Sequence, residues 1–179
     1  MAMTSPQETV YCDTDTLLNN VARHKDAKSR QELEALSSLL AMGWSGQVIM
    51  LRSRVALREI TNTTNPDQME RLLADYDALA PIVLDERVYG FHSQWDRSGG
   101  ITYPLISDVQ DEGLRDELIA QGIRKKDAEH IAQAATNHCT VFLTRDEAII
   151  SKRQWLGKRL PALKIRRPSE LLTELGNVS

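Results

Sequence analysis

The chain has 179 residues, of which 41% are hydrophobic and 26% are charged, a balance typical of a globular protein. No apolar run approaches the ~20 residues that a helix needs to cross a bilayer, so we expect no membrane partner and a cytoplasmic location. The net charge of −3, from 25 acidic and 22 basic residues, gives no bulk support for nucleic-acid binding, so any such binding must be local.

The length fits one domain, which is expected to span residues 9–176. Residues 1–8 contain neither the basic segment nor the apolar segment of a signal peptide, and we interpret them as a flexible N-terminal leader.

The first half of the chain alternates between apolar runs and segments with apolar residues at helical spacing. In chain order we predict a strand at 9–12, helices at 16–21 and 29–42, a strand at 48–51, helices at 54–61 and 67–79, and a strand at 82–84.

The second half begins with a long segment, 87–121, whose pattern is irregular from 89 to 103 and predicts a helix at 112–120. The remaining predicted elements are a helix at 126–137, a strand at 140–143, a helix at 147–156, a strand at 163–165, and a helix at 170–175 capped by Ser169. Strands that alternate with helices predict an α/β fold, in which helices cover both faces of a parallel sheet.

Four acidic residues lie where such a fold would bring them together. Asp13 and Asp146 follow predicted strands, and the carboxyl ends of parallel strands share one edge of a sheet. Asp127 lies in the first turn of its helix, where the helix dipole favours a negative charge. Glu59 lies on an otherwise core-facing helix stripe, where an acid needs a partner.

Ionised carboxylates that cluster repel one another unless a cation lies between them, and all-oxygen ligation suits Mg²⁺ or Mn²⁺. Such an ion can polarise a phosphoryl oxygen and activate water for attack on phosphorus. The acid pattern therefore predicts metal-dependent hydrolysis of phosphodiester bonds.

These residues resemble the PIN-domain family, which includes ribonuclease toxins of the VapC type. The matching pieces are Val10-Tyr11-Cys12-Asp13-Thr14-Asp15, Arg54 to Ile60, Asp127-Ala128-Glu129-His130-Ile131-Ala132, and Phe142-Leu143-Thr144-Arg145-Asp146.

The resemblance implies a three-layer α/β/α sandwich with a mainly five-stranded parallel sheet. It also implies an endoribonuclease whose metal-binding acids are Asp13, Glu59, Asp127 and Asp146, and which is the toxin of a pair with an antitoxin-like inhibitor. Thr144 matches a hydroxyl residue that accompanies the last acid in the family. At position 15 this chain has Asp where Asn or Ser is more frequent.

Several basic side chains flank the acids and could hold an RNA backbone: Arg54, Arg58, Lys126 and Arg145. His130 lies one turn after Asp127, and we expect it to serve packing rather than the site. The sequence leaves open whether the chain forms a homodimer.

Two other interpretations remain. Asp13 and Asp15 could be the nucleophile and general acid of a haloacid-dehalogenase-like phosphatase, but the late segment 143–147 lacks the glycine and the later acid which that family needs. Alternatively, the chain could be a non-catalytic PIN-fold module that binds proteins, although the complete set of acids argues against it.

Overall fold

The computed structural model describes residues 7–14, 16, 27–78, 91–95, 101–106 and 111–177. Most of the predicted helix at 16–21, the whole predicted strand at 82–84, and Asp15 lie outside the described residues.

The described strands form one sheet in the order β3-β4-β2-β1-β5-β6. Their bounds are β1 Thr9–Cys12, β2 Ile49–Ser53, β3 Phe91–Trp95, β4 Ile101–Ile106, β5 Val141–Leu143 and β6 Lys164–Arg166. The four strands β2, β1, β5 and β6 pair in parallel, which confirms four of the predicted strands to within two residues. Beyond them, β4 pairs in parallel with β2 over two residue pairs, and β3 runs antiparallel to β4.

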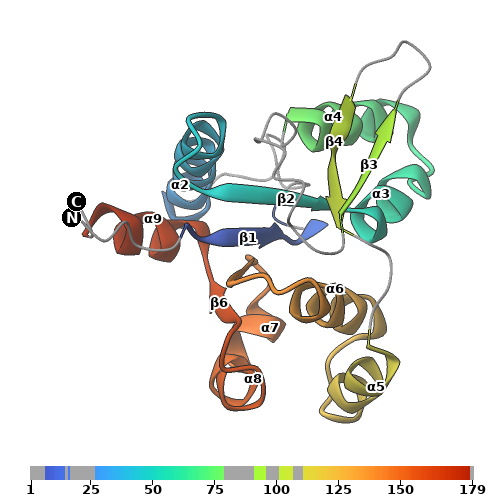
Figure 1. Ribbon diagram of the computed structural model, residues 1–179, viewed down its shortest axis with the longest axis vertical. Coiled ribbons are helices and arrows are strands. Elements are labelled where there is room, and N and C mark those ends of the chain that lie inside the picture. Colours follow the sequence, from blue (N-terminus) through green and yellow to red (C-terminus); the bar gives the residue numbers. More distant parts are fainter. Residues whose placement is uncertain are drawn as a thin grey trace.

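The described helices are α2 Ala27–Trp44, α3 Arg54–Thr61, α4 Pro66–Ala78, α5 Glu112–Ala120, α6 Lys125–Thr136, α7 Glu147–Ser151, α8 Arg153–Arg159 and α9 Pro168–Gly176. Helices α2 and α9 lie against one face of the sheet, whereas α5, α6, α7 and α8 lie on the other side (Figure 1). The fold is therefore α/β and is compatible with three layers.

Side chains alternate between the two faces along the central strands because successive Cβ atoms of a strand point in opposite directions. In β1, Val10 and Cys12 pack with Leu39 of α2 and Leu171 of α9. Tyr11, between them, packs on the opposite face, in a cluster with Ile131 and the buried alanines of α6. Because both faces are apolar, each central strand reads as a continuous hydrophobic run.

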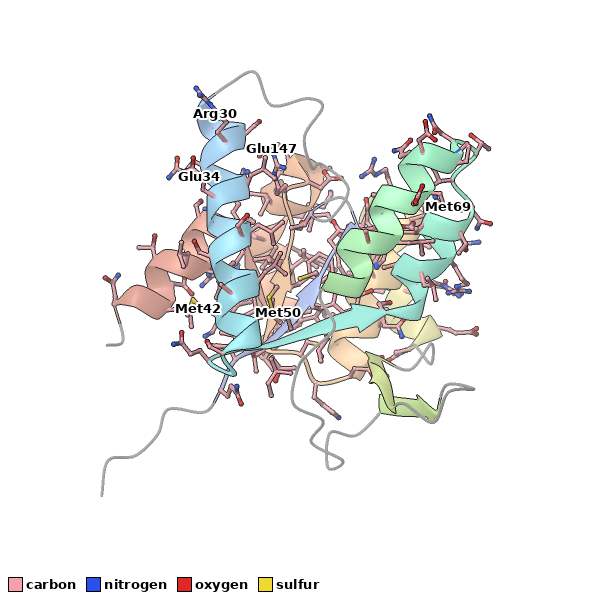
Figure 2. All side chains as sticks on the ribbon, turned by 90° about the horizontal axis from the view of Figure 1, so that it is seen from above. Arg30, Glu34, Met42, Met50, Met69 and Glu147 are labelled. Atoms are coloured by element: carbon pink, nitrogen blue, oxygen red, sulfur yellow. The ribbon has the colours of Figure 1, made fainter. Side chains whose placement is uncertain are left out.

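Helix α2 approaches β2 closely near its C-terminal end. A Cβ atom added at Gly43 would lie 3.3 Å from Cγ of Met50, a buried residue that Figure 2 labels beside this helix. The glycine therefore lets the helix backbone lie directly over the methionine side chain, whereas Arg30 and Glu34 near the other end of α2 are exposed.

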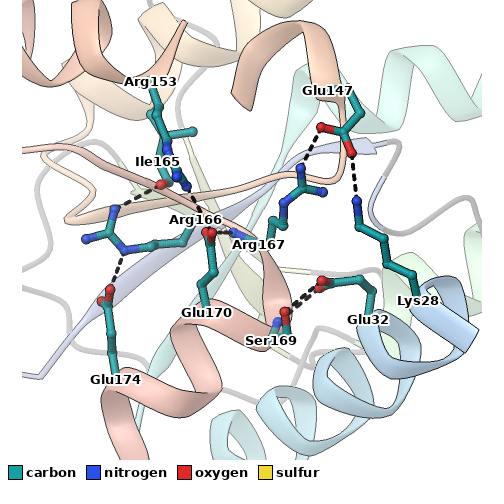
Figure 3. A network of polar contacts seen from close by, with 10 residues as sticks. All are labelled: Lys28, Glu32, Glu147, Arg153, Ile165, Arg166, Arg167, Ser169, Glu170 and Glu174. Carbon is teal, nitrogen blue, oxygen red and sulfur yellow. Dashed lines mark hydrogen bonds and ion pairs between the residues drawn. The ribbon is translucent and has the colours of Figure 1, made fainter. Parts of the chain in front are cut away.

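Helix α9 begins earlier than predicted, and Ser169 is not its cap. Arg167 is the N-cap and Pro168 takes the first helical position, where proline's fixed φ suits a helix start. Ser169 instead donates from its backbone N and from Oγ to the buried carboxylate of Glu32, at 3.0 and 2.6 Å (Figure 3). This contact joins α9 to α2.

The prediction of an irregular pattern at 89–103 is wrong for the residues that the structure describes there, because β3 and the first half of β4 fall in it. Aromatic and β-branched residues favour these strands, but Pro104 argues against a regular one. The register of the β3–β4 pair shifts between His92 and Gln94, and Pro104 lies in the facing part of β4, between Thr102 and Leu105. Proline is tolerated at such irregularities.

The single helix predicted at 147–156 is two helices, α7 and α8, which meet at Lys152. Nothing in the local sequence explains this break. At the start of the chain, the carbonyl of Glu8 accepts a hydrogen bond of 2.9 Å from Ile49 N, so the last residue of the predicted leader contacts β2. Within the described ranges, no helix is both long and apolar enough to cross a membrane.

Candidate functional site

Parallel pairing of β1 and β5 brings together residues that are 131 positions apart. Cys12 pairs with Leu143, and Asp13 N donates to Leu143 O at 3.0 Å, so the ladder extends one residue past β1. Asp13 and Thr144 therefore lie side by side at the carboxyl edge of the sheet. Both are buried, and the Thr144 hydroxyl donates to Asp13 Oδ2 at 2.8 Å.

Thr144 also fixes Asp146. The backbone N of Asp146 donates to Thr144 Oγ1 at 3.1 Å, and the Asp146 side chain caps α7 by accepting from Ala148 N at 2.7 Å. One hydroxyl thus joins the acid after β1 to the acid after β5.

Asp127 and Asp146 share the guanidinium group of Arg124, the N-cap residue of α6. Arg124 Nε donates to Asp127 Oδ2 at 2.7 Å, and Nη2 donates to Asp146 Oδ2. Both carboxylates are 13% exposed, while the Arg124 side chain is 64% exposed. Burial raises the pKa of Asp127, and the charge of Asp146 raises it further, against the lowering effect of Arg124.

Glu59 reaches the site from α3, which starts directly after β2 with the Ser53 hydroxyl accepting from Val55 N. Its Oε2 lies 3.1 Å from His130 Nε2, and its Oε1 lies 3.6 Å from Lys126 Nζ. Burial would raise the pKa of Glu59, but the hydrogen bond and charge of His130, the hydrogen bond of Thr14 and the charge of Lys126 together outweigh burial and lower the pKa to about 2.

His130 is 1% exposed, in keeping with the packing expected from sequence, and its ring nitrogens also contact Tyr11 and Glu59, which the sequence did not indicate. Burial lowers its pKa, but the hydrogen bond to Glu59 and the charges of Asp13, Glu59 and Asp127 raise it above the ordinary value. Three of the four predicted acids therefore raise the pKa of the same imidazole, and the fourth, Asp146, raises the pKa of Asp127.

The structure thus gathers all four predicted acids at one edge of the sheet, although their oxygens are engaged by protein donors. Among the residues that the structure describes, no three Asp, Glu, His or Cys side chains are arranged as a ready ligand set. The donor chemistry would still suit a divalent cation, because carboxylate oxygens are ligands that Mg²⁺ and Mn²⁺ accept, and an exposed arginine, which can exchange partners at low cost, balances the charges of two of the four acids.

The predicted RNA-binding residues lie around this edge in different settings. Lys126 is 76% exposed beside Glu59, and Arg58 is exposed on α3. Arg145 lies between Thr144 and Asp146, is partly buried, and has one buried nitrogen, Nη1, without a hydrogen-bond partner. The side chain of Arg54 lies outside the described part of the structure.

Arg124 and Tyr11 contact the site but were missed as candidates. Arg124 precedes Asp127 by three residues, the spacing of neighbours on one helix face, and that spacing could have identified the pair. Tyr11 lies in an apolar strand, and only its hydroxyl indicated that it would need a buried partner.

Comparisons with protein-family models, with curated proteins and with solved structures found no match to this chain.

Proposed function

We propose that this protein is a Mg²⁺- or Mn²⁺-dependent endoribonuclease with a PIN-like fold, in which β4 is the fifth parallel strand of a three-layer sandwich. The proposal rests chiefly on the contacts that link the four acids at this edge: Glu59 with His130, Asp13 with Thr144, and both Asp127 and Asp146 with Arg124. Buried, clustered acids with perturbed pKa values are typical of functional sites.

Asp13, Glu59, Asp127 and Asp146 would hold the cation. When bound, it would supply Lewis acidity toward a phosphoryl oxygen and lower the pKa of a water molecule.

The protein's own side chains have distinct tasks in this proposal. Thr144 orients Asp13 Oδ2 and the backbone of Asp146 through its two hydrogen bonds. Arg124 balances the negative charges of Asp127 and Asp146 until a cation takes over that role. Its exposed guanidinium then becomes available to bind a phosphate group. Asp15 belongs to the same segment as Asp13 and is assigned no task.

The test is metal-dependent cleavage of a single-stranded RNA of mixed sequence by the full chain. We expect cleavage with Mg²⁺ or Mn²⁺, no cleavage with EDTA, and product ends without 2′,3′-cyclic phosphate, because water rather than the ribose 2′-hydroxyl attacks. Asp13→Asn and Asp146→Asn should lower kcat by at least about 100-fold while retaining the circular dichroism of the folded protein.

Asp67→Asn is the matched control, since Asp67 is exposed in the first turn of α4. Undiminished cleavage by Asp13→Asn would refute the nuclease site, and absence of cleavage by the parent chain with either metal would favour the non-catalytic binding module.

The proposed RNA contacts are tested separately from catalysis. In an Asp146→Asn background, Lys126→Ala and Arg58→Ala should each weaken RNA binding and make the slope of log K against log salt shallower by about 0.7. Lys158→Ala, which removes an exposed charge in the last turn of α8, should leave both quantities unchanged. An unchanged slope in Lys126→Ala would exclude Lys126 as a phosphate contact.

A further inference from the structure

His130 joins three parts of the candidate site through its two ring nitrogens. Nδ1 lies 2.5 Å from the hydroxyl oxygen of Tyr11, in β1. Nε2 lies 3.1 Å from Glu59 Oε2, in α3, and 3.2 Å from the Thr14 hydroxyl, directly after Asp13. The imidazole itself belongs to α6, one turn beyond Asp127. It therefore contacts Glu59 and the residue that follows Asp13.

Tyr11 holds this imidazole from the core side. Its ring is fully buried, stacks on Phe142 with centroids 5.4 Å apart, and meets the His130 ring edge to face at 5.7 Å. With the tyrosine ring wedged between strand and helix and its hydroxyl at Nδ1, the histidine cannot turn without losing a buried hydrogen bond. The orientation of Nε2 is therefore set by the core.

Glu59 needs such support because it comes from a different element than the other acids. Its helix, α3, has eight residues and packs mainly through Ala56 and Ile60 against α4. At the carboxylate itself, the described partners include the exposed Lys126, the buried His130 and the buried Thr14 hydroxyl. Lys126 is free to move in solvent, whereas His130 is held in place by its own buried contact with the Tyr11 hydroxyl.

We propose that His130, supported by Tyr11, is a positioning residue that directs the carboxylate of Glu59 toward the cation site. This inference rests on the proposed function. A histidine that served packing alone would change the stability of the protein, whereas a positioning residue also changes metal affinity in protein that is fully folded.

The experiment measures Mn²⁺ affinity by isothermal titration calorimetry and RNA cleavage by steady-state kinetics, both well below the melting temperature. His130→Asn cannot reach Glu59, and we expect it to weaken Mn²⁺ binding about 10-fold or more and to lower kcat, with KM for RNA unchanged. His130→Gln, whose amide nitrogen can replace Nε2 as a donor, should recover much of the affinity. Tyr11→Phe should show a smaller loss of the same kind.

His138→Asn is the matched control, because His138 is exposed just beyond α6 and has a φ of 54°, which asparagine tolerates. It should behave as the parent chain. Parent-like Mn²⁺ affinity and kcat in His130→Asn, beside an active parent, would overturn the positioning role alone. A parent chain that neither binds Mn²⁺ nor cleaves RNA would overturn the proposed function and this role with it.

Discussion

The Thr144 hydroxyl donates a hydrogen bond of 2.8 Å to Oδ2 of Asp13, although the two residues are 131 positions apart in the chain. Both side chains are buried, so neither group can turn to water instead. The same oxygen accepts from the backbone N of Asp146, so the hydroxyl donates one hydrogen bond and accepts another.

Replacing this hydroxyl should be costly even though the shape is kept. In Thr144→Val, Asp13 Oδ2 loses the hydrogen bond that Thr144 donates and Asp146 N loses the one that Thr144 accepts, and we expect the free energy of unfolding to fall by about 1–3 kcal/mol. Thr144→Ser keeps the hydroxyl and should lose less. Urea unfolding monitored by circular dichroism measures both, and equal stability of the valine variant and the parent would contradict the prediction.

The carboxylate of Glu59 should make the stability of the protein depend on pH. Its pKa in the folded protein is lowered from 4.5 to about 2, because His130, Thr14 and Lys126 together outweigh the opposing effect of burial. A lowered pKa means that Glu59 contributes stability above pH 4.5 and that this contribution is lost as the pH falls toward 2.

The measurement compares the unfolding free energies of the parent and Glu59→Gln across that pH window. The parent should be more stable at the upper end, and the difference should shrink steadily as acid is added. Glu70→Gln, on the exposed side of α4, controls for the loss of a surface carboxylate. A difference that stays constant with pH would show that the Glu59 carboxylate is not stabilised by the fold.

Removing the guanidinium of Arg124 should lower the stability of the protein only slightly. It should increase the rise in melting temperature that Mn²⁺ causes. Because Arg124 is 64% exposed, its two ion pairs contribute only about 1 kcal/mol or less to stability. In Arg124→Ala the carboxylates of Asp127 and Asp146 keep their mutual repulsion, so Mn²⁺ should raise the melting temperature more than in the parent.

Thermal unfolding over a series of MnCl₂ concentrations tests this prediction. Arg115→Ala, which removes ion pairs with Glu112 and Asp116 on α5, should show the parent's metal response. The same response in Arg124→Ala would mean that the arginine and the cation do not share a site.

The contact between Glu32 and Ser169 predicts that a substitution far from the four candidate acids will also lower the stability of the protein. In Glu32→Gln a buried, charge-assisted interaction with the first turn of α9 becomes a weaker neutral one, and we expect a loss of about 1–3 kcal/mol. Glu34→Gln changes an exposed residue of the same helix and should alter stability by less than about 0.5 kcal/mol. Chemical denaturation of both variants distinguishes them, and equal losses would refute a special role for Glu32.

The strands and the acids that follow them could be predicted from sequence because both depend on local pattern. Apolar runs fixed β1 and β5, and parallel pairing then placed Asp13 near Asp146 without further information. The partners of these acids could not be predicted in the same way, since Arg124 and His130 meet Asp146 and Glu59 only through tertiary packing. Likewise, serine is a common N-cap residue, but here Pro168 already takes the first helical position. Ser169 instead hydrogen-bonds to Glu32, more than 130 residues earlier in the chain.

The central position of β1 also decides when the site can form during synthesis. Its neighbour β2 follows some 40 residues later, but its other neighbour, β5, is made only after more than two thirds of the chain has left the ribosome. Until then Asp13 has neither the strand that aligns it nor the Thr144 hydroxyl. A nascent or truncated chain that ends before β5 therefore lacks both the strand and the hydroxyl that position Asp13, so the acid cluster can assemble only after β5 has paired with β1.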